Sequence, residues 1–234
     1  APSWPGGATT SLPSKAPCRS FLPLSGALAP AEVGTAVMTI AARNDVVPAA
    51  DGHPPRPADP LGCFLHGLLT VDGLFASGGL RVTDTASGVT LLPGCCNDLE
   101  ERHDWFDVLD GDGRASFGHD PSPLAERHGE AVRLTVDADR DDSPVIELTV
   151  GELRRLLTGA ERDLTEFLAL AAAWAVRQLP GQAAPVTSAL ARALVLHNPA
   201  RRARRPLPHR HVRGGVAYDA VGTRRGGSGQ GGFS

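Results

Sequence analysis

The chain has 234 residues, with 23 Lys and Arg residues against 26 Asp and Glu residues and a net charge of −3 at pH 7. Lys15 is the only lysine, which excludes catalysis or phosphate binding by a lysine in the rest of the chain. No stretch approaches 18 consecutive apolar residues, so we expect neither a membrane-spanning helix nor a membrane partner.

The charge is distributed unevenly along the chain. Residues 38–196 contain 13 Arg residues and 24 acidic residues, which gives −11. Residues 197–234 contain eight Arg residues and one acid, which gives +7. The acidic body predicts a protein partner with a basic surface. The basic tail, residues 198–234, could hold nucleic acid weakly through phosphate contacts.

Composition predicts three segments in chain order. Residues 1–60 are rich in Pro, Gly, Ser and Ala, and are expected to be a disordered or non-native leader with Met38 as a candidate translation start. Residues 61–197 have the size and apolar spacing of a single domain. Residues 198–234 are expected to be a disordered tail rich in Arg and Gly. An odd number of cysteines in the domain suits a reducing cytoplasm.

Hairpins are expected in the first half of the domain, after residues 61–75, which fit either a short helix or a strand and turn. Each hairpin consists of two β-capable runs that flank Gly or polar turn residues. In chain order, the expected strands span residues 80–83 and 89–92, 105–109 and 114–118, and 131–136 and 145–148.

Three helices are expected after the hairpins, from a Thr149–Glu152 capping box and from apolar residues at three- and four-residue steps. They span residues 150–158, 161–179 and 185–196, with breaks at Gly159 and Pro180-Gly181. Strands followed by helices predict an α+β fold. It has an antiparallel sheet of about four to six strands, with two or three C-terminal helices packed on one face.

Reactive side chains are most concentrated in residues 93–105, which include Cys95, Cys96 and His103. A cysteine paired with a histidine can act as a nucleophile or a metal ligand. A simpler interpretation makes the cysteines small buried apolar residues, with Asn97 or Asp98 capping a short helix. Adjacent cysteines of an extended chain point to opposite sides, so no metal site and no cofactor is assigned.

A second candidate is the proline-held loop 118–123, which carries His119 and Asp120. These residues could serve as a base and its orienting acid or as two metal ligands, although Asp120 and Ser122 could simply close turns. The acidic loop 137–142 does not follow the calcium-binding pattern and is expected to be a solvated hairpin tip. Trp105 and Trp174 are expected in the core.

The segment from residue 80 to residue 196 resembles small proteins of high-GC actinobacteria that have no assigned activity. The likeness is carried by Leu91-Leu92-Pro93-Gly94-Cys95-Cys96-Asn97, by Gly118-His119-Asp120-Pro121-Ser122-Pro123 and by Glu161-Arg162-Asp163-Leu164. It implies a bacterial cytoplasmic protein and transfers no catalytic residue.

Two functional hypotheses follow. The first is an acidic, non-enzymatic protein-binding module of a regulatory or immunity type, because the charge is strong and no catalytic signature is present. The alternative is a small cysteine- and histidine-dependent enzyme or metal-binding protein. It would use Cys95, Cys96, His103, His119 and Asp120, and it requires their two segments to meet in space.

Overall fold

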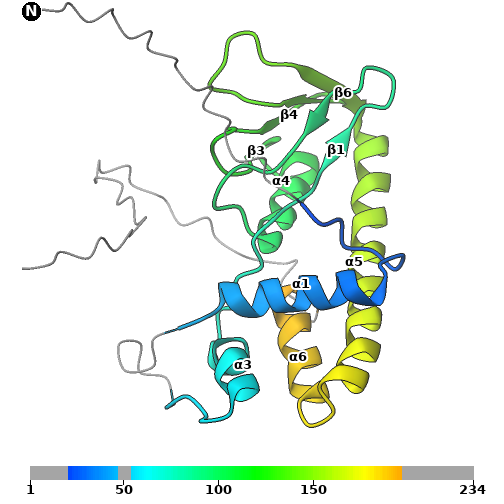
Figure 1. The fold of residues 1–234 in the computed structure, drawn as a ribbon. Helices are drawn as coiled ribbons and strands as arrows, with labels where there is room; N and C mark the ends of the chain where they lie inside the picture. Colours follow the sequence, from blue (N-terminus) through cyan, green and yellow to red (C-terminus); the bar gives the residue numbers. More distant parts are fainter. Residues whose placement is uncertain (1–20, 47–53, 197–234) are drawn as a thin grey trace, which may run out of the picture. The chain divides into compact units, whose positions relative to one another are not determined.

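The computed structural model describes residues 21–46 and 54–196, which form an α+β fold (Figure 1). The predicted basic tail and residues 1–20 of the predicted leader lie outside the described residues. The elements, in chain order, are α1 (Pro30–Arg43), α3 (Pro60–Thr70), β1 (Val82–Thr83), β2 (Thr90–Leu91), the 3-10 helix η1 (Leu99–His103), α4 (Asp104–Asp110), β3 (Arg114–Ser116), β4 (Leu124–His128), β5 (Ala131–Thr135), β6 (Val145–Thr149), α5 (Val150–Gln178) and α6 (Ala183–Ala193).

The described strands form two antiparallel sheets instead of the one larger sheet that was expected. Strands β1 and β2 make a two-stranded sheet, and the other sheet has the order β3-β4-β5-β6. The first and third predicted hairpins are confirmed as β1-β2 and β5-β6. In β5, Val132 and Leu134 are buried while Arg133 between them is exposed, which is the alternation expected of a half-buried strand.

The second predicted hairpin is wrong, because residues 105–109 lie in α4. Trp105, Val108 and Leu109 are buried, and their three- and four-residue spacing places them on one helical face. Strand β3 pairs instead with β4, which the sequence did not predict. Only Ala125 of β4 is fully buried, so the apolar alternation of that strand is weak.

Helix α1 corrects the prediction for residues 1–60. It packs against α3 and α5 and contributes buried side chains to an apolar core, namely Val33, Ala36, Val37, Ile40 and Ala41. The prediction that residues 1–60 lie outside the fold is therefore wrong for residues 30–43. The helical spacing is hard to recognise in the sequence because two of the buried positions are alanines, Ala36 and Ala41. Alanine is also frequent in the rest of residues 1–60.

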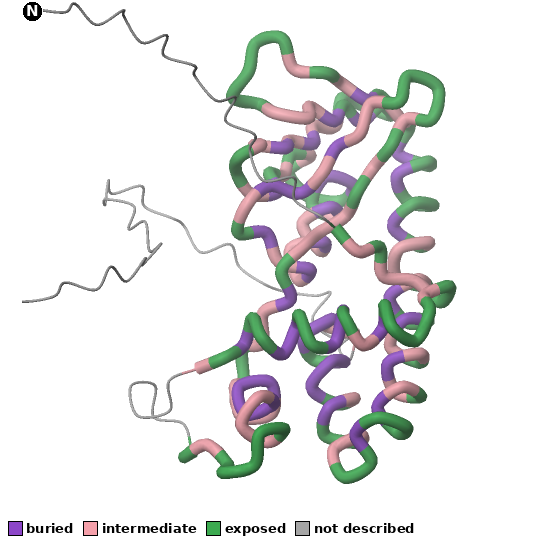
Figure 2. Tube along the Cα trace, in the orientation of Figure 1, coloured by how far each residue is buried: buried purple, intermediate pink, exposed green. Residues whose placement is uncertain are grey.

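Helix α5 is continuous over 29 residues, so the predicted break at Gly159 is wrong. Its buried positions recur along the helix (Figure 2) at Val150, Leu153, Leu157, Leu164, Phe167, Ala171 and Ala175. The predicted capping box is confirmed, since Thr149 Oγ1 accepts from the Glu152 amide at 3.2 Å and Glu152 accepts from the Thr149 amide at 2.8 Å.

Two clusters of buried side chains make up the core of the described residues. Trp105, Phe117 and residues of β4, β5 and β6 belong to the first cluster, and residues of α1, α3 and α6 belong to the second. Helix α5 contributes to both, because Leu153 and Leu157 lie in the first cluster and Leu164 and Phe167 lie in the second. Trp105 is buried in the core as expected, while the partly buried Trp174 packs against the second cluster.

A buried arginine links three elements. Arg102 of η1 is 2% exposed and donates to Glu161 of α5 at 3.0 Å, to the Leu99 carbonyl at 2.7 Å and to the Val195 carbonyl after α6 at 3.4 Å. A buried charge needs such partners, because its desolvation is costly when it is left unpaired.

Candidate metal centre

The two candidate segments meet in the structure. Cys95, after β2, and His119, after β3, form an isolated antiparallel bridge. The His119 amide donates to the Cys95 carbonyl at 3.4 Å, and the Cys95 amide donates back to the His119 carbonyl. The condition that the sequence set for a shared site is therefore met.

Two glycines allow this close approach. A Cβ atom on Gly94 would overlap the backbone of His119 and Pro121. Gly118 has a φ of +91°, and a Cβ atom there would lie 2.6 Å from the Cys95 carbonyl oxygen. Only residues without a side chain fit here, so these two glycines are a sequence signal of the crossing, although glycine alone does not identify the partner loop.

The histidine loop is anchored to the core at its start. Phe117 is buried and stacks on Trp105, with ring centroids 4.1 Å apart and an interplanar angle of 11°. Its amide donates to the Pro123 carbonyl at 3.0 Å, and its carbonyl accepts from the Gly94 amide at 2.8 Å. The loop that carries His119 is thus held at both ends.

The acidic connector between β5 and β6 holds the same loop from a second side. The Ser122 amide donates to Asp137 at 3.1 Å, the Ser122 hydroxyl donates to Asp139 at 2.5 Å, and the Ala138 amide donates to the Ser122 carbonyl at 2.7 Å. Two carboxylates that were expected to be a solvated hairpin tip therefore support the candidate site.

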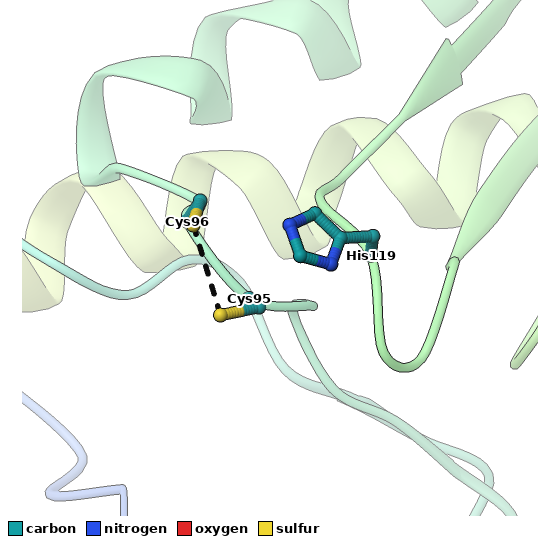
Figure 3. Close-up of side chains that lie close together, drawn as sticks. All are labelled: Cys95, Cys96 and His119. Atoms are coloured by element: carbon teal, nitrogen blue, oxygen red, sulfur yellow. Dashed lines mark hydrogen bonds between the residues drawn. The ribbon is translucent and has the colours of Figure 1, made fainter. Parts of the chain in front are cut away.

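The two cysteines present their sulfurs on the same side of the chain. Cys96 has a φ of 63°, so the backbone is not extended there, and the Sγ atoms of Cys95 and Cys96 lie 3.7 Å apart (Figure 3). The expectation that adjacent cysteines would point apart is wrong, because it assumed a strand conformation at Cys96.

His119 completes the group. One ligand atom from each of Cys95, Cys96 and His119 can be chosen so that all three lie within 4.8 Å of one another. No other group of three His, Cys, Asp or Glu residues that could hold a metal was found in the part of the chain that the structure describes. The three side chains come from two loops (Figure 3).

Asp120 sets the orientation of the imidazole. His119 Nδ1 lies 2.9 Å from Asp120 Oδ2. An ionised carboxylate only accepts hydrogen bonds, so Nδ1 carries the hydrogen and the lone pair of the neutral ring lies on Nε2. Figure 3 shows this nitrogen on the side of the ring that faces Cys96. A carboxylate–histidine pair of this kind commonly supports a metal ligand.

The sulfur spacing suits a single tetrahedral ion. Two thiolates bound at about 2.3 Å with a tetrahedral angle have sulfurs about 3.8 Å apart, close to the 3.7 Å between Cys95 and Cys96. Thiolate and imidazole ligands are both typical of Zn²⁺. Thiolates are soft ligands and therefore also suit Cu⁺.

The fifth candidate, His103, is not in this group. It lies at the end of η1, with Nδ1 2.9 Å from the Glu100 carbonyl oxygen and its ring stacked on Phe106 at 6.4 Å between centroids. Its polar contact is within its own turn, and we assign it a structural role.

The simpler interpretation of the cysteine segment is also partly confirmed. Asp98 caps η1 by accepting from the Glu100 amide at 3.0 Å, and burial raises its pKa above the ordinary value. Burial likewise raises the pKa of Glu101, with a further contribution from the neighbouring carboxylate of Asp104. The buried position expected for the cysteines is wrong, because Cys95 is half-buried and Cys96 is exposed.

The side chains of the site are open to solvent. The His119 and Asp120 side chains are 60% and 82% exposed. Two hollows of the described residues, of about 340 and 320 Å³, are lined by residues of β1 and α5 among others, and none of the three ligand candidates lines them.

Comparisons of the chain with protein-family models, curated proteins and solved structures find no match. Among residues 21–46 and 54–196, no helix combines the length and the apolar character needed to cross a bilayer.

Proposed function

We propose that this chain binds a thiophilic transition-metal ion, with Zn²⁺ as the reference ion, through Cys95, Cys96 and His119. The observation that carries the proposal is the pair of sulfurs 3.7 Å apart with an imidazole beside them. The spacing agrees with that of two thiolates on one tetrahedral ion.

The surroundings support a cation. Asp120 directs the lone pair of the imidazole away from itself. The described residues contain 13 Arg residues and 24 acids, so a positive ion is favoured by the overall field.

A cysteine enzyme is the competing use of the same residues. Cys95 or Cys96, His119 and Asp120 have the order of a nucleophile, a base and an orienting acid. Such chemistry works best in a pocket that excludes water, and the high exposure of His119 and Asp120 favours metal binding over catalysis.

Titration of the reduced full-length chain with Co²⁺, a spectroscopic substitute for Zn²⁺, tests the proposal. We expect one ion per chain and a thiolate-to-cobalt charge-transfer band that is lost on adding Zn²⁺. Cys95→Ser and Cys96→Ser should each remove one thiolate contribution and weaken binding. Cys63→Ser and His128→Asn are matched controls elsewhere in the fold and should bind normally. A titration without this band, or one unchanged in the Cys95→Ser/Cys96→Ser double variant, would contradict the proposal.

The charge of the described residues supports a second proposal, an acidic module that binds a protein with a basic surface. The observation that supports it is the net charge of −11 of the described residues, from 13 Arg residues and 24 acids. Such a charge steers association with a basic partner. A pull-down from a bacterial extract, repeated at low and high salt, should retain a basic protein only at low salt. The absence of any salt-sensitive basic partner would count against it. The resemblance to small actinobacterial proteins stays a prediction.

A further inference from the structure

The proposed metal site offers three ligands where a structural zinc site uses four. Structural zinc ions are enclosed by four protein ligands. Here the group consists of Cys95, Cys96 and His119, and within the described ranges no fourth His, Cys, Asp or Glu joins it. An ion held by these three side chains alone would have one coordination position left for a further ligand.

The ligands are nevertheless held in place. The Cys95–His119 bridge, the Phe117–Trp105 stack and the contacts of Ser122 with the acidic connector fix both loops. Binding therefore needs little rearrangement of the backbone, and an incoming ligand can reach the ion without the loops having to open.

The open position does not resemble a catalytic one. A catalytic zinc ion activates a bound water inside a shaped, dry cavity. Cys96 and His119 are exposed, and the two hollows of about 340 and 320 Å³ are lined by other residues. The exposed position is suited to a ligand that arrives from another molecule.

We propose that the ion is exchangeable cargo, passed to or from a partner protein that presents a thiolate or an imidazole. This inference rests on the proposed metal binding and goes beyond it by naming the role of the ion. The acidic surface would favour a partner whose donor group lies in a basic surface.

The transfer is a ligand exchange without a redox change. An incoming thiol loses its proton to solvent as its sulfur bonds to the ion at the fourth position. Further donor groups of the partner then replace Cys95, Cys96 and His119 one at a time, and the released thiolates take up protons from solvent. The ion stays divalent, and no electron donor or acceptor is required.

The first test uses the Co²⁺-loaded full-length chain with reduced glutathione as the thiol probe. An open position predicts that the thiolate-to-cobalt absorption rises by about half, as the ion gains a third sulfur beside two. An unchanged spectrum at saturating glutathione would overturn the inference. The same addition to the Cys63→Ser variant should give the same rise.

The second test measures the rate at which a chelator removes Zn²⁺ from the chain. Attack at an open position predicts a rate that increases linearly with chelator concentration. A closed site predicts a rate that does not depend on chelator concentration, because spontaneous dissociation is then limiting.

These tests separate the two proposals. Failure of stoichiometric Co²⁺ binding refutes the metal site, whereas tight binding with a concentration-independent rate refutes only the cargo role.

Discussion

Single residues with unusual backbone angles shape the candidate site. Cys96 and Asp120 have φ values of 63° and 52°, in the left-handed region that costs residues with side chains on the order of 1 kcal/mol or more. Strained residues often gather at functional sites. Here one of them brings two sulfurs together and the other carries the carboxylate that orients His119.

Replacing Asp120 tests its role as a positioning residue. Asp120→Asn keeps a residue that tolerates a positive φ but removes the charge beside Nδ1. We expect Zn²⁺ affinity to fall by about tenfold, the lower end of the range for such supporting residues, because the pair is exposed. Competition with a chromophoric chelator measures this. Asp141→Asn makes the same change in net charge in the exposed connector and should leave affinity unchanged. Equal affinities of the two variants would contradict the assignment.

Gly94 tests the crossing of the two loops. Gly94→Ala places a methyl group into the backbone of His119 and Pro121. We therefore expect a loss of more than about 1 kcal/mol in the free energy of unfolding, together with weaker Co²⁺ binding. Urea unfolding and Co²⁺ titration measure the two effects. Gly73→Ala is the matched control, because a Cβ atom there meets nothing within 4 Å. A Gly94→Ala variant as stable as this control would show that the loops do not cross so closely.

At this scale the sequence named the residues but not their geometry. Cys95, Cys96, His119 and Asp120 were predicted from their reactivity alone, and the structure brings them together. The conformation of Cys96 could not be read from its neighbours, since it accompanies pairing with a loop far along the chain. His103 is the histidine nearest to the cysteines in sequence and was expected to be their partner, but it is not in the group.

At the scale of elements, apolar periodicity predicted the long helix correctly. The prediction was wrong where Gly residues after a short helix were interpreted as a hairpin turn. Residues 161–179 were predicted correctly as helix because apolar side chains recur over many turns. The Asp-Gly pairs after residue 109 suggested a hairpin turn, yet Gly111 follows the end of α4 and its amide donates to the Asp107 carbonyl at 2.9 Å. A glycine after a helix and a glycine in a hairpin look the same in sequence.

Gly159 gives the clearest test of an element. The stripe from Leu157 to Leu164 continues across it, and Glu161 just beyond it binds the buried Arg102. A Cβ atom at Gly159 would meet nothing within 4 Å. Gly159→Ala should therefore raise the free energy of unfolding by about 0.8–1 kcal/mol, the usual difference between these residues inside a helix. Urea denaturation followed by circular dichroism measures it.

The opposite substitution is the control for the same helix. Gly159→Pro should destabilise by about 3 kcal/mol or more, because proline removes a hydrogen bond and clashes within a continuous helix. If the helix ended near residue 158 as the sequence predicted, alanine would not stabilise and proline would be tolerated.

At the scale of the whole described molecule, the α+β class followed from the order of the predicted elements, but the extent of the fold did not. Composition placed the start of the domain near residue 61, while the structure packs α1 into the second core cluster. Gly34 lies against the indole of Trp174, where a Cβ atom would be 3.2 Å from the ring. Such a contact between distant parts of the chain leaves no local sequence signal.

Substitutions at two neighbouring residues of α1 test whether this helix unfolds together with the rest of the described fold. Val37 is fully buried, while Met38, the candidate start, is 39% exposed. Val37→Ala removes two buried methyl groups and should lower the free energy of unfolding by about 2 kcal/mol, whereas Met38→Ala should change it by less than about 0.5 kcal/mol. Urea denaturation of both variants measures the difference. The Co²⁺ absorption should be lost in the same transition as the helical signal, because α5 contributes to both core clusters. Equal stability of the two variants would place α1 outside the cooperative unit.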